Sequence, residues 1–194
     1  MKTFSLIRAV AAAALLATGA AAQAEVASYA IDPTHTFVTF EVRHFGTSTN
    51  RGRFDKKSGT VEIDRAAKKG KVELTLETGS INTGVAPFEK HLRSADFFDV
   101  EQFPTAVFKA DQFSFDGDKV SEVKGTLTML GKTHPVTLKA SNFNCYNHPM
   151  LKREVCGGDF DTTIQRSQWG MNWGIAMGVP DATHLLIQVE AVRQ

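Results

Sequence analysis

Residues able to do chemistry gather in one stretch of the chain, Lys90–Phe108, which reads KHLRSADFFDVEQFPTAVF. His91 lies there within a few residues of Asp96 and Asp99. A histidine near two carboxylates is a common arrangement, so these three residues do not by themselves indicate an acid–base catalyst. His91 and Arg93 are also hydrogen-bond donors, and the arginine fork suits phosphate or carbonyl oxygens. The stretch is therefore a better candidate for binding a polar group than for catalysis.

The remaining sequence contains no recognisable catalytic motif. It has no nucleophile elbow, no Walker-type phosphate loop, no HExxH zinc motif and no dinucleotide-binding glycine pattern. We therefore predict that the protein is not an enzyme.

The two cysteines, Cys145 and Cys156, lie in the stretch NCYNHPMLKREVCGG. In an oxidising compartment the first expectation is a disulfide across this loop, and the chain-entropy model gives a loop of this length roughly 3 kcal/mol of stabilisation. His148 stands between them, so a zinc site built on all three residues is the alternative. No fourth ligand is apparent, however, and the spacing matches no common zinc motif. The sequence predicts a Cys145–Cys156 disulfide and no metal.

Residues 1–24 have the features of a secretory signal peptide. Lys2 and Arg8 lead into an apolar run that ends at Ala22-Gln23-Ala24, a small-x-small cleavage pattern. We expect cleavage there and a periplasmic location, with one domain over residues 25–194; an uncleaved signal anchor is the alternative. Without its two basic residues the chain has 20 Lys+Arg against 21 Asp+Glu, so its charge does not indicate nucleic-acid binding.

Alternating apolar and polar residues dominate the rest of the chain, as is typical of strands with one buried face. The clearest segments are THTFVTFEVRHF, KVELTLET, EVKGTLTML, PVTLKA and HLLIQVEAV, and the shorter ones are GTVEID, TAVFKA, FSF and DFDTTIQR. Asp116-Gly117-Asp118 and Gly131-Lys132 indicate hairpins. The pattern predicts an all-β, antiparallel protein of eight or more strands. Alternation alone does not distinguish a closed barrel from a sandwich.

The connection between KVELTLET and TAVFKA interrupts this pattern, since about 25 residues is long for a link between strands. Pro87 suits the first turn of a helix, and Glu89 and Arg93 stand four residues apart in the favourable order for a helical ion pair. We predict a short helix around residues 87–95. It either plugs one end of the sheet or contributes to a binding site.

Four stretches together resemble the motifs of the YceI-like family of exported bacterial proteins, in the family's order. They are DPTHTFVTFEVRHFG, GRFDKKSGTVEID, KHLRSADFFDVEQFPTAVF and GTLTMLGKTHPVTLKA. The resemblance covers residues 31–140, is looser over residues 141–177, and extends to the cysteine-bearing loop only for a subset of members. It implies a lipocalin-like fold, an eight-stranded antiparallel β-barrel whose interior takes a long apolar molecule. Family members resemble binders of polyisoprenoids and related lipids, quinones included.

Under this resemblance, the stretch Lys90–Phe108 becomes a candidate ligand site. We expect His91 and Arg93 to meet a polar head group, and Leu92, Phe97 and Phe98 to pack on the adjoining part of the tail. The expected wall of the cavity contains flat or flexible apolar side chains, namely Phe40, Phe108, Met129, Trp169 and Met171.

His35 and His44 are weaker candidates for contact with the ligand, since either can equally be a structural histidine. For the apolar wall residues the alternative is an ordinary core filled by the protein's own side chains.

The predicted function is binding: an exported protein that sequesters or carries a long isoprenoid-type lipid, without a covalent cofactor. The expected partners are the apolar lipid and, transiently, a membrane or membrane protein for handover; nucleic acid is not expected, and a homodimer is left open. The alternative function is a quinone-binding redox module that works with a membrane electron-transfer partner. Two further alternatives are a hydrolase or isomerase acting on lipid head groups, and a structural barrel with a filled core.

Overall fold

Strands make up most of residues 26–194, the part of the chain that the computed structural model describes. The predicted signal peptide, residues 1–24, lies outside the described residues. The elements in chain order are β1 (Ala27–Ile31), β2 (Phe37–His44), β3 (Ser48–Phe54), β4 (Lys57–Asp64), β5 (Lys69–Glu77), the 3₁₀ helix η1 (Thr78–Ser80), β6 (Ile81–Asn82), α1 (Ala86–Arg93), β7 (Thr105–Asp116), β8 (Lys119–Met129), β9 (Lys132–Asn147), β10 (Glu154–Gln165), η2 (Arg166–Trp169), η3 (Ile175–Met177) and β11 (Ala182–Arg193).

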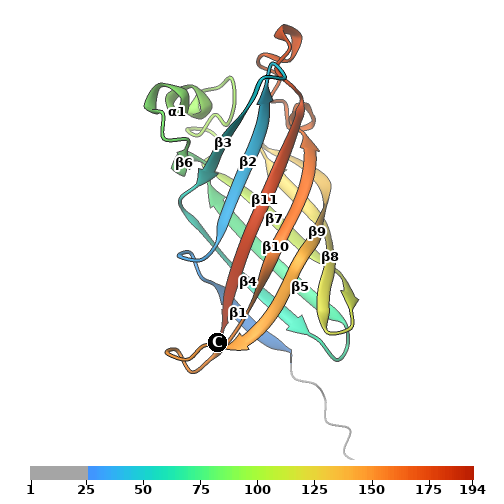
Figure 1. The fold of residues 1–194 in the computed structure, drawn as a ribbon. Coiled ribbons are helices and arrows are strands. Elements are labelled where there is room, and N and C mark those ends of the chain that lie inside the picture. Colours follow the sequence, from blue (N-terminus) through green and yellow to red (C-terminus); the bar gives the residue numbers. More distant parts are fainter. Residues whose placement is uncertain (1–25) are drawn as a thin grey trace, which may run out of the picture.

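The strands close into a barrel because β11 pairs with two partners on the same side. Residues 184–188 of β11 pair with β2, and residues 191–193 pair with β1. β1 and β2 therefore lie one after the other along β11, and together they count as one strand of the barrel wall. β4 and β3 share the next position, since they pair with β1 and β2, and β5 and β6 share the third. With β7, β8, β9, β10 and β11 the wall is an eight-stranded antiparallel barrel, as predicted (Figure 1).

Several predicted strand boundaries were wrong. TAVFKA and FSF are parts of one strand, β7, and PVTLKA belongs to the 16-residue strand β9. The cysteine-bearing segment, predicted as a loop, is mostly strand: β9 and β10 form a long hairpin in which Cys145 lies directly opposite Cys156. The predicted disulfide between these two residues is confirmed, and it ties adjacent strands rather than closing an open loop.

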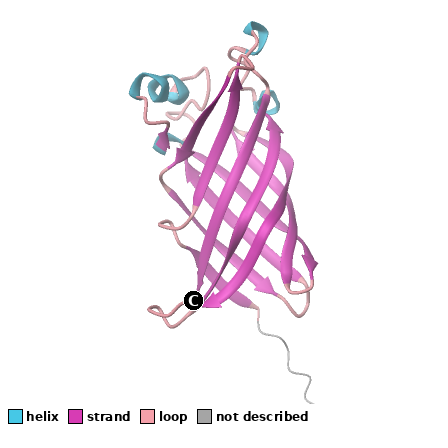
Figure 2. Cartoon of the chain, in the orientation of Figure 1, coloured by secondary structure: helices cyan, strands magenta, loops and turns pink. Residues whose placement is uncertain are grey.

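The helical segments gather at the end of the barrel opposite the C-terminus (Figure 2). The helix predicted around residues 87–95 is confirmed as α1, with Pro87 in its first turn. The Glu89 carboxylate accepts hydrogen bonds from the backbone N–H groups of Thr83 and Gly84, at 2.9 and 3.1 Å, which anchors the helix start to the loop before it. Leu92 is the buried residue of α1. No helix in residues 26–194 is long and apolar enough to span a bilayer.

Candidate functional site

The barrel encloses an apolar cavity of about 590 Å³ at the end that carries the helices. Its wall is made mainly by inward-facing residues of β2, β3, β5, β7, β8, β9, β10 and β11, together with residues of α1. A smaller cavity of about 80 Å³ lies further along the barrel. Leu74, Phe108, Leu138 and Ile187 line both cavities, so one layer of side chains separates them. The interior is therefore not a core filled by the protein's own side chains.

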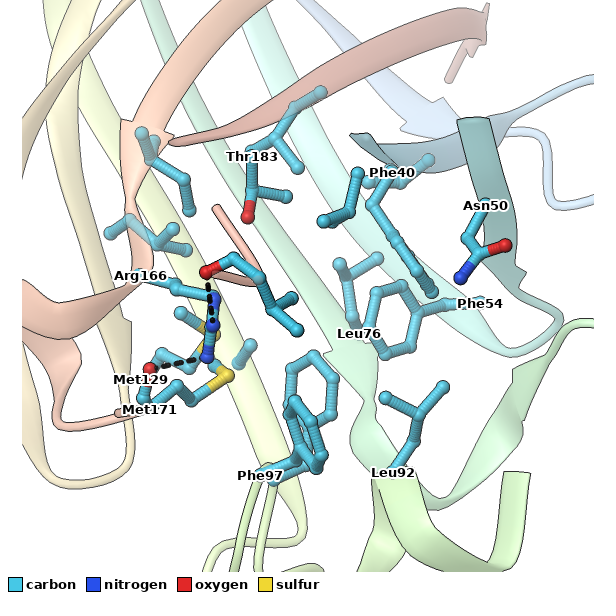
Figure 3. A pocket seen from close by; sticks show the side chains of 18 of the residues that line it. Phe40, Asn50, Phe54, Leu76, Leu92, Phe97, Met129, Arg166, Met171 and Thr183 are labelled. Carbon is cyan, nitrogen blue, oxygen red and sulfur yellow. Dashed lines mark hydrogen bonds between the residues drawn. The ribbon is translucent and has the colours of Figure 1, made fainter. Parts of the chain in front are cut away.

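Eight of the ten side chains predicted to contact a ligand line the main cavity; they are Phe40, His91, Leu92, Phe97, Phe98, Phe108, Met129 and Met171. Figure 3 shows Phe40, Leu92, Phe97, Met129 and Met171 among the lining side chains. The weaker candidate His44 lines it too. The other weak candidate, His35, instead makes an ion pair with Asp32 at 2.7 Å between β1 and β2.

The structure places Arg93 away from the cavity, in contrast to its predicted role as a head-group donor. Its Nε donates to the carbonyl oxygen of Gly79 at 2.9 Å, and Nη2 donates to that of Ile81 at 2.6 Å. Nη2 also lies 3.3 Å from the Glu89 carboxylate. Arg93 faces the outside of the wall from α1, where it fixes the helix to the segment containing η1 and β6.

Trp169 also does not line the cavity. It is almost fully buried, its indole N–H donates to the carbonyl oxygen of Leu127 at 3.0 Å, and its ring meets that of His134 edge to face. The residue holds η2 against the wall formed by β8 and β9, and thereby supports the cavity from behind.

The sequence analysis missed Arg166, Thr183 and Asn50, which are polar residues of the cavity wall. Strand parity was the available signal: Ile164 faces inward, so Arg166, two residues later, falls on the same face. The sequence segment DFDTTIQR contains both residues, but an arginine at a strand end is ordinarily expected to turn outward.

Arg166 is buried, with 5 % of its surface exposed, and its guanidinium is held by backbone carbonyl groups. Nε donates to Pro180 at 3.0 Å, Nη1 to Met171 at 2.7 Å, and Nη2 to Trp173 at 2.8 Å. Figure 3 shows the contact between Arg166 and Met171. A longer contact of 3.5 Å joins Nη2 to the carbonyl oxygen of Val179. Burial lowers the pKa of Arg166 below its ordinary value, yet arginine remains protonated at neutral pH.

The ionisable side chains that line the cavity are all basic. Arg43, His44, His91 and Arg166 line it, and no aspartate or glutamate of the described residues does. No carboxylate of residues 26–194 lies within 4.0 Å of the Arg166 guanidinium. The arrangement favours a ligand that is apolar over most of its length and carries oxygen acceptors at one end.

An aromatic cluster joins α1 to the loop between η2 and η3. The His91 ring lies edge to face against Trp173 at 4.6 Å and against Phe97 at 5.0 Å. Its Nε2 is 2.8 Å from the Asp96 carboxylate. These contacts orient His91 within the lining, so the residue predicted to meet a ligand is held in place by its neighbours.

One potential metal-ligand cluster occurs among residues 26–194, formed by Cys145, Glu154 and Cys156. Both thiols are consumed by the disulfide, so the cluster offers no thiolate ligand. The zinc alternative built on Cys145, His148 and Cys156 is excluded for the same reason.

A closed eight-stranded β-barrel with an apolar interior cavity is the architecture of lipocalin-like binding proteins. The YceI-like domain model matches residues 29–191, and the chain belongs to the YceI-like family. A UPF0312 protein of Pseudomonas paraeruginosa is 34 % identical over 177 residues, covering 90 % of this chain and 91 % of the relative.

Solved structures show the same fold. BcnA of Burkholderia cenocepacia superimposes with a TM-score of 0.69 at 22 % identity, covering 82 % of this chain and 98 % of that one. A polyisoprenoid binding domain from Saccharophagus degradans, implicated in plant cell wall breakdown, superimposes with a TM-score of 0.63 at 17 % identity, covering 86 % of this chain and 98 % of that one.

Proposed function

We propose that the protein is a carrier that holds a long apolar, isoprenoid-type lipid inside the barrel. The observation that carries this proposal is the cavity of about 590 Å³, whose wall is apolar except for a few donors. The structural neighbour from Saccharophagus degradans, described as a polyisoprenoid binding domain, supports the same ligand class. The family's fold is that of binding proteins, and we propose binding rather than catalysis for this member.

The cavity volume bounds the size of the ligand. At about 30 Å³ per water-sized group, the 590 Å³ cavity has room for about 20 non-hydrogen atoms. Burial of about 20 CH₂-sized groups at about 0.8 kcal/mol each sums to about 16 kcal/mol, below the practical ceiling of about 20 kcal/mol for non-covalent binding. Ordering the chain removes part of this free energy. A lipid of this size should still leave slowly into water, so release requires an apolar acceptor.

We also propose export to the periplasm. The features of residues 1–24 support it, and so does the Cys145–Cys156 disulfide, because such bonds persist in oxidising compartments. N-terminal sequencing of protein from the periplasmic fraction should then begin at Glu25.

Handover to a membrane should occur at the end with the helices. Phe45, Trp173 and Met177 line the cavity and are also exposed, so they form a rim that joins the interior to the surface. Arg43 and His44 stand beside Phe45 and suit an anionic membrane surface. We call Phe45, Trp173 and Met177 the rim.

Organic extraction of freshly purified protein, followed by mass spectrometry, tests the carrier proposal. One apolar molecule per chain is expected, and recovery of nothing stoichiometric would contradict the proposal. The same sample separates the quinone alternative, since a quinone has ultraviolet bands that change on addition of borohydride and a prenyl lipid does not.

The variant Ala106→Trp tests whether the lipid binds in the main cavity. Ala106 is buried and lines the cavity, so the larger side chain occupies ligand space, and lipid content should fall to about a tenth or less if the cavity is the site. Lys109→Trp places the same side chain on the outer face of β7 and should leave the content unchanged. Circular dichroism establishes that both variants are folded.

A further inference from the structure

Thr183 is a buried polar side chain that the protein itself leaves without a partner. Only 8 % of its surface is exposed, it lines the main cavity, and its hydroxyl has no hydrogen-bond partner among the described residues. Burying a hydroxyl without a hydrogen-bond partner is unfavourable, because the group loses its hydrogen bonds to water. The other two buried threonines, Thr36 and Thr78, both have backbone partners. The exception at Thr183 therefore requires a reason inside the cavity.

Thr183 and Arg166 belong to one polar area of the wall. In the β10–β11 ladder Thr183 lies opposite Ile164, and the backbone N–H of Arg166 donates to the carbonyl oxygen of Asp181 at 3.1 Å as the hairpin continues. Arg166 is thus the diagonal neighbour of Thr183 on the inner face, a relation that places side chains about 7–8 Å apart. Figure 3 shows both side chains reaching into the cavity.

Arg166 retains unused donor capacity. A guanidinium has five N–H groups, and the four contacts to carbonyl oxygens account for four of them, which leaves one N–H on Nη1. The carboxylate of Asp181, the residue opposite Arg166 across the hairpin, is turned away, because its oxygens accept from the backbone N–H and the hydroxyl of Ser167 at 2.7 and 2.6 Å. The Phe97 ring, 6.0 Å from the Arg166 Cζ atom, covers another side of the guanidinium.

We infer that Arg166 and Thr183 form a head-group subsite that takes an anionic oxygen group, a carboxylate or phosphate, at the end of the bound lipid. Both residues can donate to the same group, whereas the cavity wall offers it no carboxylate repulsion. Backbone dipoles offset part of the arginine charge but cannot neutralise it, so an anion gains more there than a neutral carbonyl group. The inference rests on the proposed lipid-binding function and adds the chemistry and orientation of the ligand's polar end.

The orientation follows from the position of the subsite. The head group would lie inside the barrel near the rim, and the tail would run past Met129 and Phe108 toward the smaller cavity. The polar end would then be the part of the ligand closest to the exit, beside His91 and Arg43.

Three probes with one tail test the subsite on the delipidated full protein: geranylgeranoic acid, geranylgeranyl phosphate and the methyl ester of the acid. At least one anionic probe should bind about ten-fold more tightly than the ester, because hydrogen bonds to a charged group are the stronger ones. Whichever anion binds more tightly identifies carboxylate or phosphate as the natural head. Arg166 itself is not substituted, since its loss would release the carbonyl groups that it holds.

Thr183→Val removes the hydroxyl while preserving the branched shape. Affinity for the preferred anionic probe should fall about ten-fold, affinity for the ester should stay within about two-fold, and the ligand-free protein should gain thermal stability as the unpaired hydroxyl disappears. Thr183→Ser restores a hydroxyl and should recover the anion preference.

The outcomes distinguish a failure of the head-group subsite from a failure of the lipid-binding function. If acid, phosphate and ester bind equally, or if Thr183→Val binds the anions as the unchanged protein does, the subsite is refuted while lipid binding stands. If none of the three probes binds, the carrier function itself fails.

Discussion

Arg93 and Arg166 lie in positions opposite to those that the sequence around each of them indicates. Arg93, in a stretch crowded with charged and aromatic residues, is held by backbone carbonyl groups on the outside of the wall. Arg166, at the end of an ordinary alternating strand, lines the cavity. The difference arises from geometry: Leu92 takes the inward face of the short helix α1, so the next residue is directed away from the cavity, toward carbonyl groups of η1 and β6.

Arg93→Ala should therefore affect stability rather than ligand choice. Loss of two hydrogen bonds from a charged donor, on a half-exposed side chain, should lower the free energy of unfolding by about 2 kcal/mol. The lipids extracted from the variant should have the same head groups as those from the unchanged protein. Urea unfolding and mass spectrometry measure the two effects, and an altered head-group profile at unchanged stability would restore the role first predicted for Arg93.

At the scale of elements, the barrel depends on the interruption between β1 and β2. The chain bends at residues 32–36, where the Asp32 N–H donates to the carbonyl oxygen of Glu190 at 2.9 Å and the buried Thr36 hydroxyl binds the same oxygen at 3.2 Å. This bend allows two strands to share one side of β11. The Asp32 carboxylate closes the bend by accepting from the backbone N–H and hydroxyl of Thr34 and by pairing with His35.

The bend should make stability depend on pH. Burial, the largest single influence, raises the pKa of Asp32, but the hydrogen bonds from His35 and Thr34 together outweigh it and lower that pKa from 3.8 to about 2. The hydrogen bond to Asp32 raises the pKa of His35 above 6.5. The contribution of Asp32 is thus present above about 4 and lost as the pH falls toward 2, whereas that of His35 is present below 6.5 and lost as the pH rises through its raised pKa.

We therefore expect the destabilisation caused by Asp32→Asn to be largest between pH 4 and 6.5 and smaller at pH 2–3 and at pH values above the raised pKa of His35, as measured by urea unfolding at each pH. His35→Gln keeps a hydrogen-bond donor but has no group that titrates. It should therefore remove only the loss of stability that occurs as the pH rises through the raised pKa of His35. An effect of Asp32→Asn that is the same at every pH would show that the pair makes no electrostatic contribution.

At the scale of the whole molecule, the two ends of the barrel differ. The end with α1, η2 and η3 carries the rim and the main cavity, whereas the other end carries the β9–β10 turn and the C-terminus (Figure 1). Exposed apolar side chains occur at both ends: Phe45 is 55 % exposed at the rim and Leu151 is 50 % exposed in the β9–β10 turn. Only the first continues into the cavity lining. The asymmetry favours exchange of ligand through one end.

Phe45→Asn should slow lipid transfer to anionic vesicles several-fold, because an exposed aromatic side chain that enters the membrane interface is lost. Asparagine tolerates the left-handed backbone at this position, where φ is 50°, so the β2–β3 turn should persist. The lipid content before transfer should not change. Leu151→Asn, at the opposite end, is the matched control; equal slowing by both variants, or by neither, would contradict transfer through the rim.

The sequence by itself determined the fold class, the disulfide partners, the position of the short helix and most of the apolar cavity wall. Period-two alternation predicts which residues share a face of a strand. The family resemblance over residues 31–140 indicated a barrel and not a sandwich. The tertiary structure alone decided that the interior is hollow, that Arg93 and Trp169 lie outside it, and that Arg166 and Thr183 line it. The reason is physical: side-chain direction follows from local parity, but which polar groups find partners depends on the path of irregular segments that alternation does not predict, as Arg166 does on carbonyl groups of residues 171–180.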